Sequence, residues 1–205
     1  MSLQKDRVNS IIKILIFSDF LILSAVGFIN PIFALFVANK VHGASLEVVG
    51  YSATILLIVK SLAQLPIAKY VDKTPGERDD FNFIFWGSLL ASISSFLYLC
   101  VSEVWQLYLL QGLYGLANAM AFPSWFALFS RHVDKRKEGF EWGIYSSIVG
   151  IGIALTGAAG GIMAQRMGFD AVFITVGVIS LMGTLLILLL RKSIIRHDIL
   201  KIHDK

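Results

Sequence analysis

The feature that most constrains this chain is a series of long apolar stretches joined by short polar connections. A helix that spans the hydrocarbon core of a bilayer needs about 20 consecutive, mostly apolar residues. Six stretches reach that length, and they cover residues 11–37, 48–70, 81–101, 104–129, 140–163 and 171–190. The sequence therefore predicts an all-α integral membrane protein with six transmembrane helices.

Composition agrees with this class. Of the 205 residues, 56% are apolar and only 16% are charged, and the mean hydropathy is +0.72. Soluble domains carry about 25% charged residues, so a soluble globule of this composition would lack the polar side chains to cover its surface. Because the connections are short, we expect residues 1–205 to form one transmembrane domain with no soluble domain attached.

The basic residues predict the orientation, since cytoplasmic loops retain Lys and Arg. Of the 18 basic residues, 15 fall on one side of the six stretches, only Lys40 and Arg166 fall on the other, and Lys60 lies inside a stretch. The larger set comprises Lys5, Arg7, Lys13, Lys69, Lys73, Arg78, Arg131, Lys135, Arg136, Lys137, Arg191, Lys192, Arg196, Lys201 and Lys205. We expect a multi-pass protein of the cell (inner) membrane with both termini cytoplasmic. The net charge of +4 then reflects membrane-flanking loops, and nucleic acid is not an expected partner.

The signatures of enzymes are missing from the sequence. No HExxH or GxSxG motif occurs, and the four histidines lie outside the apolar stretches. A glycine-rich phosphate loop would need a strand before it and a helix after it, which this pattern does not offer. We expect no enzymatic activity, no cofactor and no metal site.

An offset of 93 residues superimposes the first three stretches on the last three. The string Phe-Ala-Leu-Phe occurs at residues 33–36 and again at 126–129, and Gly50 corresponds to Gly143. Because three spans separate the copies, the second copy enters the membrane from the opposite side. The sequence therefore predicts two inverted three-helix repeats, over residues 11–101 and 104–190, as found within the halves of some transporters.

Polar residues inside spans are costly and are functional candidates by default. Asp19 and Lys60 fall at similar depths from the same membrane face, so helices packed side by side could bring them together. One interpretation is a proton- or substrate-responsive pair, and the other is a static salt bridge between helices. The uncharged candidates for a polar lumen are Asn30, Gln64, Gln111 and Asn118. Each of these, taken singly, is also typical of hydrogen bonding between helices.

Three motifs point to one family. Asp72 and Lys73, followed by Arg78, occupy the connection between the second and third stretches, and Asp19 precedes Gly27 and Pro31 in the first. The fifth stretch carries Gly143, Gly152, Gly157, Gly160 and Gly161. Over nearly its whole length, the chain resembles the N-terminal six helices of a major facilitator superfamily transporter, nearest to the drug–proton antiporters of the tetracycline-efflux type. The chain departs from the pattern at Ala68 in the loop motif, at Thr156-Gly157 in place of Gly-Pro, and at Tyr108 in place of an arginine.

This resemblance implies half of a major facilitator fold and a secondary active transporter of small molecules. It implies that Asp72, Lys73 and Arg78 form a charge latch against a neighbouring half. Because such folds enclose substrate between two six-helix halves, we expect a homodimer working by alternating access, with proton-coupled efflux as one mode. The alternatives are a half or fragment that needs a separate partner half, and a non-transporting membrane protein such as a lipid scramblase or an assembly factor. Expected partners are membrane lipid and a small-molecule substrate.

Overall fold

The computed structural model describes residues 10–73 and 77–203, with side chains as far as residue 191. Predictions that rest on Lys5, Arg7, the loop residues 74–76 and the side chains beyond residue 191 fall outside this part of the chain. The helices are α1 (Ser10–Ile29), α2 (Phe33–Lys40), α3 (Leu46–Lys73), α4 (Arg78–Leu97), α5 (Val104–His132), α6 (Glu138–Met167) and α7 (Phe169–His203). A short 3-10 helix, η1 (Tyr98–Cys100), follows α4. The prediction of an all-α fold is confirmed for the described residues.

Within the described residues, five helices are long and apolar enough to cross a membrane. They are α1, α3, α4 with η1, α6, and α7 as far as Arg191. The remaining long helix, α5, has 29 residues but includes Gln111, Asn118 and Arg131, and it is not among these five. The prediction of a multi-pass membrane protein is therefore supported by five spans, and the sixth stays a prediction.

The first predicted span, residues 11–37, is wrong as a single helix. Helix α1 ends at Ile29, a turn covers residues 30–32, and α2 begins at Phe33. The cause is Pro31, which has no N–H to donate and which disfavours helical backbone at the residue before it. The backbone N–H of Phe36 then bonds the carbonyl of Ile32 at 2.8 Å, so a new helix starts just past the proline.

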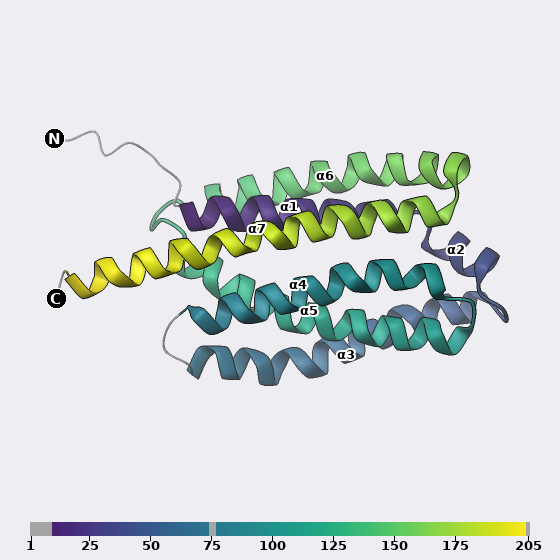
Figure 1. The fold of residues 1–205 in the computed structure, drawn as a ribbon, viewed down its shortest axis with the longest axis horizontal. Helices are drawn as coiled ribbons and strands as arrows, with labels where there is room; N and C mark the ends of the chain where they lie inside the picture. The colour runs from purple at the N-terminus through teal and green to yellow at the C-terminus, as the bar shows by residue number, and fades with distance from the viewer. Residues whose placement is uncertain (1–9, 74–76, 204–205) are drawn as a thin grey trace.

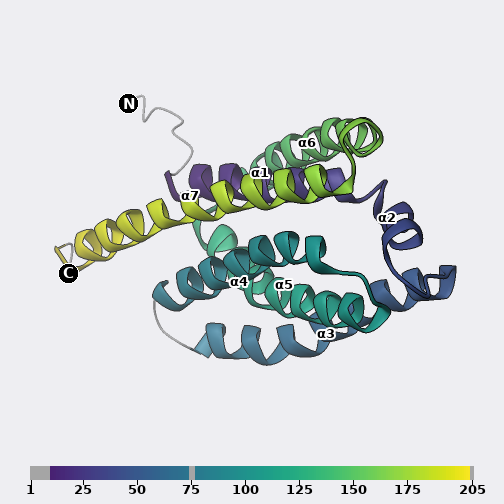
Figure 2. The same cartoon turned by 45° about the vertical axis from the view of Figure 1, so that its right-hand side comes forward.

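The long helices form two groups of three. Helices α1, α6 and α7 pack together as the first group, and α5 holds α3 and α4 in the second group. The groups meet where α7 packs on α4 and α1 approaches α5, a boundary that we call the seam (Figures 1 and 2). Because α3 packs chiefly on α5, the first two predicted spans are not the close neighbours that the sequence interpretation assumed.

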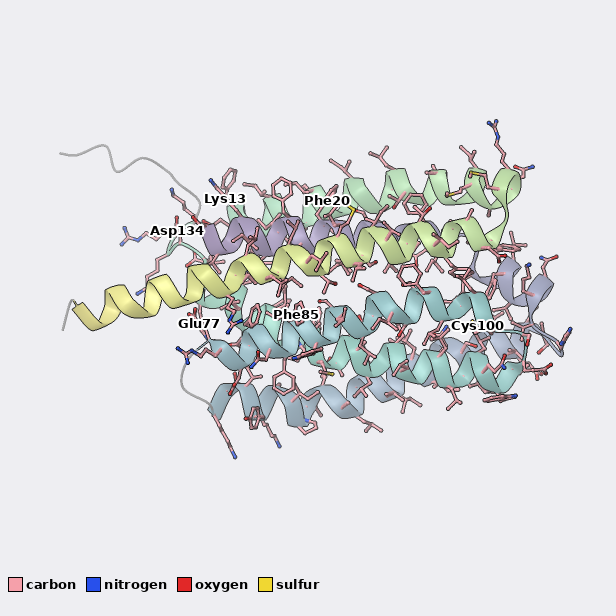
Figure 3. All side chains as sticks on the ribbon, in the orientation of Figure 1. Lys13, Phe20, Glu77, Phe85, Cys100 and Asp134 are labelled. Carbon is pink, nitrogen blue, oxygen red and sulfur yellow. The ribbon has the colours of Figure 1, made fainter. Side chains whose placement is uncertain are left out.

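The two ends of the bundle differ in charge. The start of α1, the end of α7, the end of α3, the start of α4 and the connection from α5 to α6 lie at one end, which we call the basic end (Figure 1, left). Figure 3 shows Lys13, Glu77 and Asp134 there, whereas Cys100 lies at the opposite end. The opposite end holds α2, η1 and the turn from α6 to α7, together with Lys40 and Arg166. The predicted separation of basic residues is thus present in the fold, while the membrane side that each end faces stays a prediction.

Apolar clusters close the seam toward both ends. Near the basic end, Leu15, Phe129 and Ile187 are buried together, and near the opposite end Phe36 and Phe173 pack at 4.7 Å between ring centroids. In a membrane these contacts stabilise the two groups through van der Waals packing, because lipid tails are as apolar as the side chains that they would otherwise touch.

Candidate functional site

A cavity of about 200 Å³ lies in the seam and contains three of the predicted site residues. Asp19 of α1, Lys60 of α3 and Asn118 of α5 all line it, so residues from both helix groups meet there. We call it the charged cavity. The sequence predicts a similar depth in the membrane for these three residues, and in the fold they line the same cavity.

Asp19 is held by a residue that the sequence interpretation missed. The phenol of Tyr145, on α6, donates a hydrogen bond of 2.5 Å to Asp19 Oδ2. Tyr145 in turn packs on Trp125 of α5, with ring centroids 4.7 Å apart. The sequence gives no sign of this role, because aromatic residues near the ends of membrane helices are common and Tyr145 does not stand out among them.

Lys60 interacts with an aromatic ring instead of with Asp19. Its Nζ lies 4.5 Å from the centroid of the Phe122 ring, within the range of a cation–π interaction. Among the described residues no ion pair joins Lys60 to Asp19. The interpretation as a static salt bridge is therefore not realised in this structure, and each charge faces the cavity with its own neighbour.

Asn118 does not link helices in this conformation. Its Nδ2 donates to the carbonyl of Tyr114, one turn earlier in α5, at 2.8 Å. The amide thus stays on its own helix while lining the charged cavity. This arrangement favours a role on the cavity wall over hydrogen bonding between helices.

A second cavity, of about 240 Å³, lies further toward the opposite end. Asn30 and Gln111 line it together with Tyr98 and Tyr114, and no charged residue is among its lining. We call it the neutral cavity, and Tyr114 lines both cavities. Gln111 is only 3% exposed, and its Oε1 has no hydrogen-bond partner among the described residues. An acceptor buried in this way costs about 1–3 kcal/mol if left unpaired, so a donor from a ligand or a water molecule fits there.

Gln64 stands apart from the other candidates. It is half-buried on α3 and lines neither of the two cavities. Of the six predicted pathway residues, the fold brings Asp19, Lys60 and Asn118 to one cavity and Asn30 and Gln111 to the next.

The glycines of α6 divide between two faces. Gly152 and Gly160 pack on α1, where an added Cβ at Gly160 would lie 2.8 Å from the Cα of Phe28. Gly157 also faces α1, where an added Cβ would lie 3.7 Å from the carbonyl oxygen of Gly27. Gly143 and Gly161 have nothing within 4 Å of an added Cβ. Part of the motif therefore serves packing within the chain, and part lies on an uncovered face.

The predicted latch residues lie at the basic end. Asp72 and Lys73 are exposed at the end of α3, and Arg78 is exposed at the start of α4. The buried charges nearby are ones that the sequence interpretation missed. Asp80 is 1% exposed and is paired with Arg131, so this pair ties the start of α4 to the end of α5.

A second buried contact lies beside that pair. Nε2 of His132 is 3.4 Å from Glu77 Oε1, and both side chains are buried. The acid-rich run of residues 77–80 and the basic pair at 131–132 contain the signal, but only the fold shows that the two segments meet.

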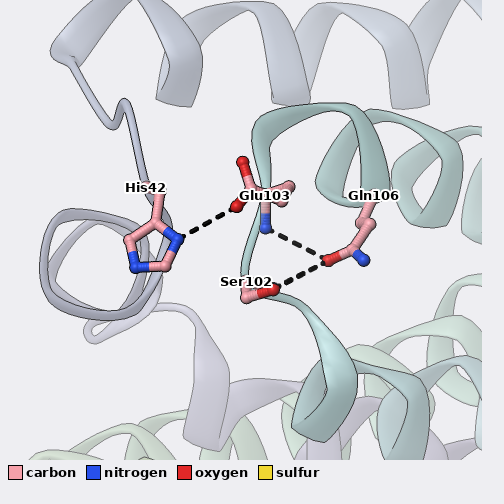
Figure 4. Close-up of polar contacts among 4 residues, drawn as sticks. All are labelled: His42, Ser102, Glu103 and Gln106. Atoms are coloured by element: carbon pink, nitrogen blue, oxygen red, sulfur yellow. Dashed lines mark hydrogen bonds and ion pairs between the residues drawn. The ribbon is translucent and has the colours of Figure 1, made fainter.

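The opposite end is fastened by a contact between two connections (Figure 4). Nδ1 of His42 lies 3.0 Å from Glu103 Oε1, and the backbone N–H of His42 bonds the carbonyl of Ser102 at 2.8 Å. Gln106 Oε1 accepts from the backbone N–H groups of Ser102 and Glu103 at 2.8 and 3.1 Å, which completes a capping box at the start of α5. Capping of this kind satisfies donors that a helix start leaves unpaired.

No group of three or more His, Cys, Asp or Glu residues suited to a metal ion occurs in the part of the chain that the structure describes. The site is therefore defined by a carboxylate, an ammonium group, amides and aromatic rings. Chemically, such a set can bind polar parts of a small molecule and can exchange a proton at Asp19.

The helices and the cavities together define a multi-pass, all-helical membrane protein with polar cavities between two helix groups. The chain belongs to the Major Facilitator Superfamily, because the model of that family matches residues 15–199. It is also similar to an uncharacterized MFS-type transporter of Methanocaldococcus jannaschii, with 24% identity over 169 residues. That alignment covers 82% of this chain and 42% of the relative, so the chain spans less than half of the relative's length. The predicted family is confirmed, and the tetracycline-efflux type stays a prediction.

Proposed function

We propose that this chain is a six-helix unit of a secondary transporter for small molecules. The observation that carries the proposal is the pair of cavities in the seam, where Asp19 and Lys60 face a common space inside a chain of this family. Secondary transporters place substrate near the middle of the membrane, at the interface between structural repeats. Membership of this family points to transport rather than to catalysis.

The packing pattern supports two inverted repeats, α1–α3–α4 and α5–α6–α7. In this arrangement α1 corresponds to α5, α3 to α6 and α4 to α7. The contact of α1 with α7 then corresponds to that of α5 with α4, and the contact of α1 with α6 corresponds to that of α5 with α3. All four contacts are extensive, and the contact of α4 with α7 maps onto itself. A pseudo-two-fold relation between the repeats predicts this pairing.

A transport path of this type needs a second six-helix unit. The most exposed spans are α3 and α6, with 11% and 17% of their most apolar windows buried, against 44% for α1 and for α7. These two helices are equivalent under the exchange of repeats, and we propose that they contact the second unit. That unit is a second copy of this chain or a separate partner half, and alternating access is the rocking of one unit against the other.

Asp19 is our proposed coupling residue. Its hydrogen bond with Tyr145 joins α1 to α6, so a proton bound at Asp19 changes a contact between two helices. Tyr108 occupies the position where the family has an arginine, and we propose that Lys60 supplies the positive charge inside the membrane instead. We propose that the transporter works by proton-coupled efflux across the inner membrane, with both termini in the cytoplasm. We also propose that Asp72, Lys73 and Arg78 form a latch against the second unit.

The test begins with ligand-induced thermal stabilisation of the purified chain in detergent. The probes are tetraphenylphosphonium as an organic cation, glycine betaine as a zwitterion and benzoate as an anion. A ligand at 100 times its Kd stabilises the folded state by about 2.7 kcal/mol. We expect one charge class to raise the Tm of the wild type. The shift should be lost in Asp19→Asn or Lys60→Met and retained in Asp170→Asn, a control at the opposite end.

Uptake of the stabilising probe into liposomes then measures transport. Proton-coupled uptake that is untouched by Lys60→Met would remove Lys60 from the proposal. Exchange of a fluorescent phospholipid between leaflets, without uptake of any probe, would favour a lipid scramblase and would contradict solute transport.

A further inference from the structure

A groove on the face of the bundle formed by α4 and α7 is not used by the proposed transport path. It lies at the basic end, has a volume of about 470 Å³ and shares no lining residue with the two seam cavities. Arg78 and Asn82 of α4 line it, and Arg191 and Leu188 of α7 lie across from them. Figure 3 shows Phe85, a further lining residue, in the stretch of α4 beside α7.

The groove brings together two positive charges without an internal counter-ion. Arg78 and Arg191 are exposed, and within the described residues neither takes part in an ion pair. No carboxylate is among the lining residues. The nearby acid Asp80 is buried and already paired with Arg131. Two guanidinium groups on one cavity favour an anion with several oxygens, because the planar fork of arginine matches phosphate in a bidentate manner.

The lining changes from charged to apolar along the helix axis. From Arg78 and Asn82, the wall continues along α4 to Phe85 and Trp86, and on α7 Leu188 lies one turn inward from Arg191. Over the eight residues from Arg78 to Trp86, a helix rises about 12 Å. A ligand that fills this groove therefore needs an anionic head at the basic end and an apolar tail toward the middle of the membrane.

We propose that the groove binds an anionic phospholipid, with its phosphate between Arg78 and Arg191 and its acyl chains along Phe85, Trp86 and Leu188. The apolar wall is the reason for choosing a lipid over a free phosphate ion. The predicted orientation agrees, because anionic lipids are enriched in the cytoplasmic leaflet and basic pockets between helices bind their head groups. This proposal does not rest on the seam cavities, and it gives Arg78, which we also propose for the latch, a second role.

The experiment is native mass spectrometry of the full chain in detergent, titrated with phosphatidylglycerol or phosphatidylcholine. We expect phosphatidylglycerol to bind more tightly, and Arg78→Gln and Arg191→Gln to weaken it about fivefold each. That factor corresponds to about 1 kcal/mol for each basic residue near the membrane surface. Arg166→Gln removes a positive charge at the opposite end and should leave the affinity unchanged. Glycerol 1-phosphate, the soluble head group, should not displace the lipid.

Three results would overturn the proposal. These are equal binding of the two lipids, unchanged affinity in the double variant Arg78→Gln/Arg191→Gln, and full displacement by glycerol 1-phosphate, which would identify a small-anion site. Circular dichroism checks that each variant is folded. If the double variant does not fold, Arg78→Lys and Arg191→Lys provide the test, because they retain charge but lose the bidentate geometry and should bind with intermediate affinity.

Discussion

The hydrogen bond between Tyr145 and Asp19 is the most specific polar contact in the charged cavity. It joins residues 126 positions apart in the chain and crosses from α6 to α1. A carboxylate taken out of water is costly unless it is hydrogen-bonded. The phenol therefore offsets part of the cost of placing an acid inside a span.

We predict that Tyr145→Phe lowers the free energy of unfolding by about 1–3 kcal/mol, because it leaves the Asp19 carboxylate without its donor. In the background of Asp19→Asn the same change should cost clearly less. Thermal unfolding of the two single variants and the double variant in detergent gives the coupling energy. Equal costs in both backgrounds would show that the hydrogen bond does not contribute. Tyr51→Phe, at an exposed tyrosine, is the control.

The buried pair at the basic end leads to a second prediction. Arg131→Met leaves Asp80, which is 1% exposed, without its partner, and removal of one member of a buried pair typically costs about 3–5 kcal/mol. We expect a lower value here, about 2–3 kcal/mol, because Arg131 is itself 37% exposed. Asp80→Asn/Arg131→Met should recover part of the loss.

The matched control for this pair lies at the opposite end. Lys40 and Asp170 are 4.0 Å apart and both exposed, so Lys40→Met should change stability by at most about 0.5–1 kcal/mol. If Lys40→Met and Arg131→Met had the same effect, the buried pair would have no special role.

At the scale of elements, the contact between α1 and α6 depends on small residues. An added Cβ at Gly160 would overlap the backbone of Phe28, whereas one at Gly161 meets nothing within 4 Å. We predict that Gly160→Ala destabilises the chain by about 1–3 kcal/mol, as overpacking does. Gly161→Ala should be neutral or stabilising by up to about 1 kcal/mol, because alanine favours helix over glycine. Unfolding in detergent compares the two, and a loss in Gly161→Ala alone would reverse the assignment of the faces.

Much of this element-level description follows from sequence. The apolar stretches predict the helices, and the basic residues predict which ends lie together. The single-span prediction for residues 11–37 failed because hydropathy averages over a proline that breaks hydrogen bonding locally. The sequence also did not predict which helices are neighbours, because the pattern of apolar residues does not show that α3 packs on α5 instead of on α1.

The candidate site was predictable in part, because polar side chains inside an apolar span are costly. Charged and amide side chains inside spans stand out by their cost, so residue type and depth were enough to propose Asp19, Lys60 and Asn118, and the fold places all three on one cavity. Tyr145 was not, because a tyrosine is unremarkable in a membrane helix until its partner is known. The Asp80–Arg131 pair was missed because its members lie at span ends, where charged residues are expected in any case.

At the scale of the whole molecule, the uncovered faces of α3 and α6 lead to a prediction about assembly. Small, exposed residues recur every three or four positions along α6, at Gly143, Ser147, Gly150 and Ala154. Such residues allow close approach of another helix. We predict that the chain is a dimer in mild detergent by native mass measurement, and that Gly150→Trp abolishes the dimer while Leu185→Trp, on lipid-exposed α7, does not.

A chain that stays monomeric and transports nonetheless would contradict the need for a second unit. A monomer that transports only when a separate six-helix half is added would replace the homodimer with a partner half.

If the seam cavities belong to a transport path, water reaches the side chains that line them, and the accessibility of introduced cysteines measures this. The single native cysteine, Cys100, is exposed and is first replaced by alanine. Asn118→Cys in the charged cavity is then compared with Leu185→Cys on α7. The native Leu185 side chain is 53% exposed, and both residues lie a similar number of residues along their helices from the opposite end. Cells are treated with a charged, membrane-impermeant methanethiosulfonate reagent. We predict that Asn118→Cys reacts and that Leu185→Cys does not; equal reactivity at the two positions would contradict a path through the seam cavities.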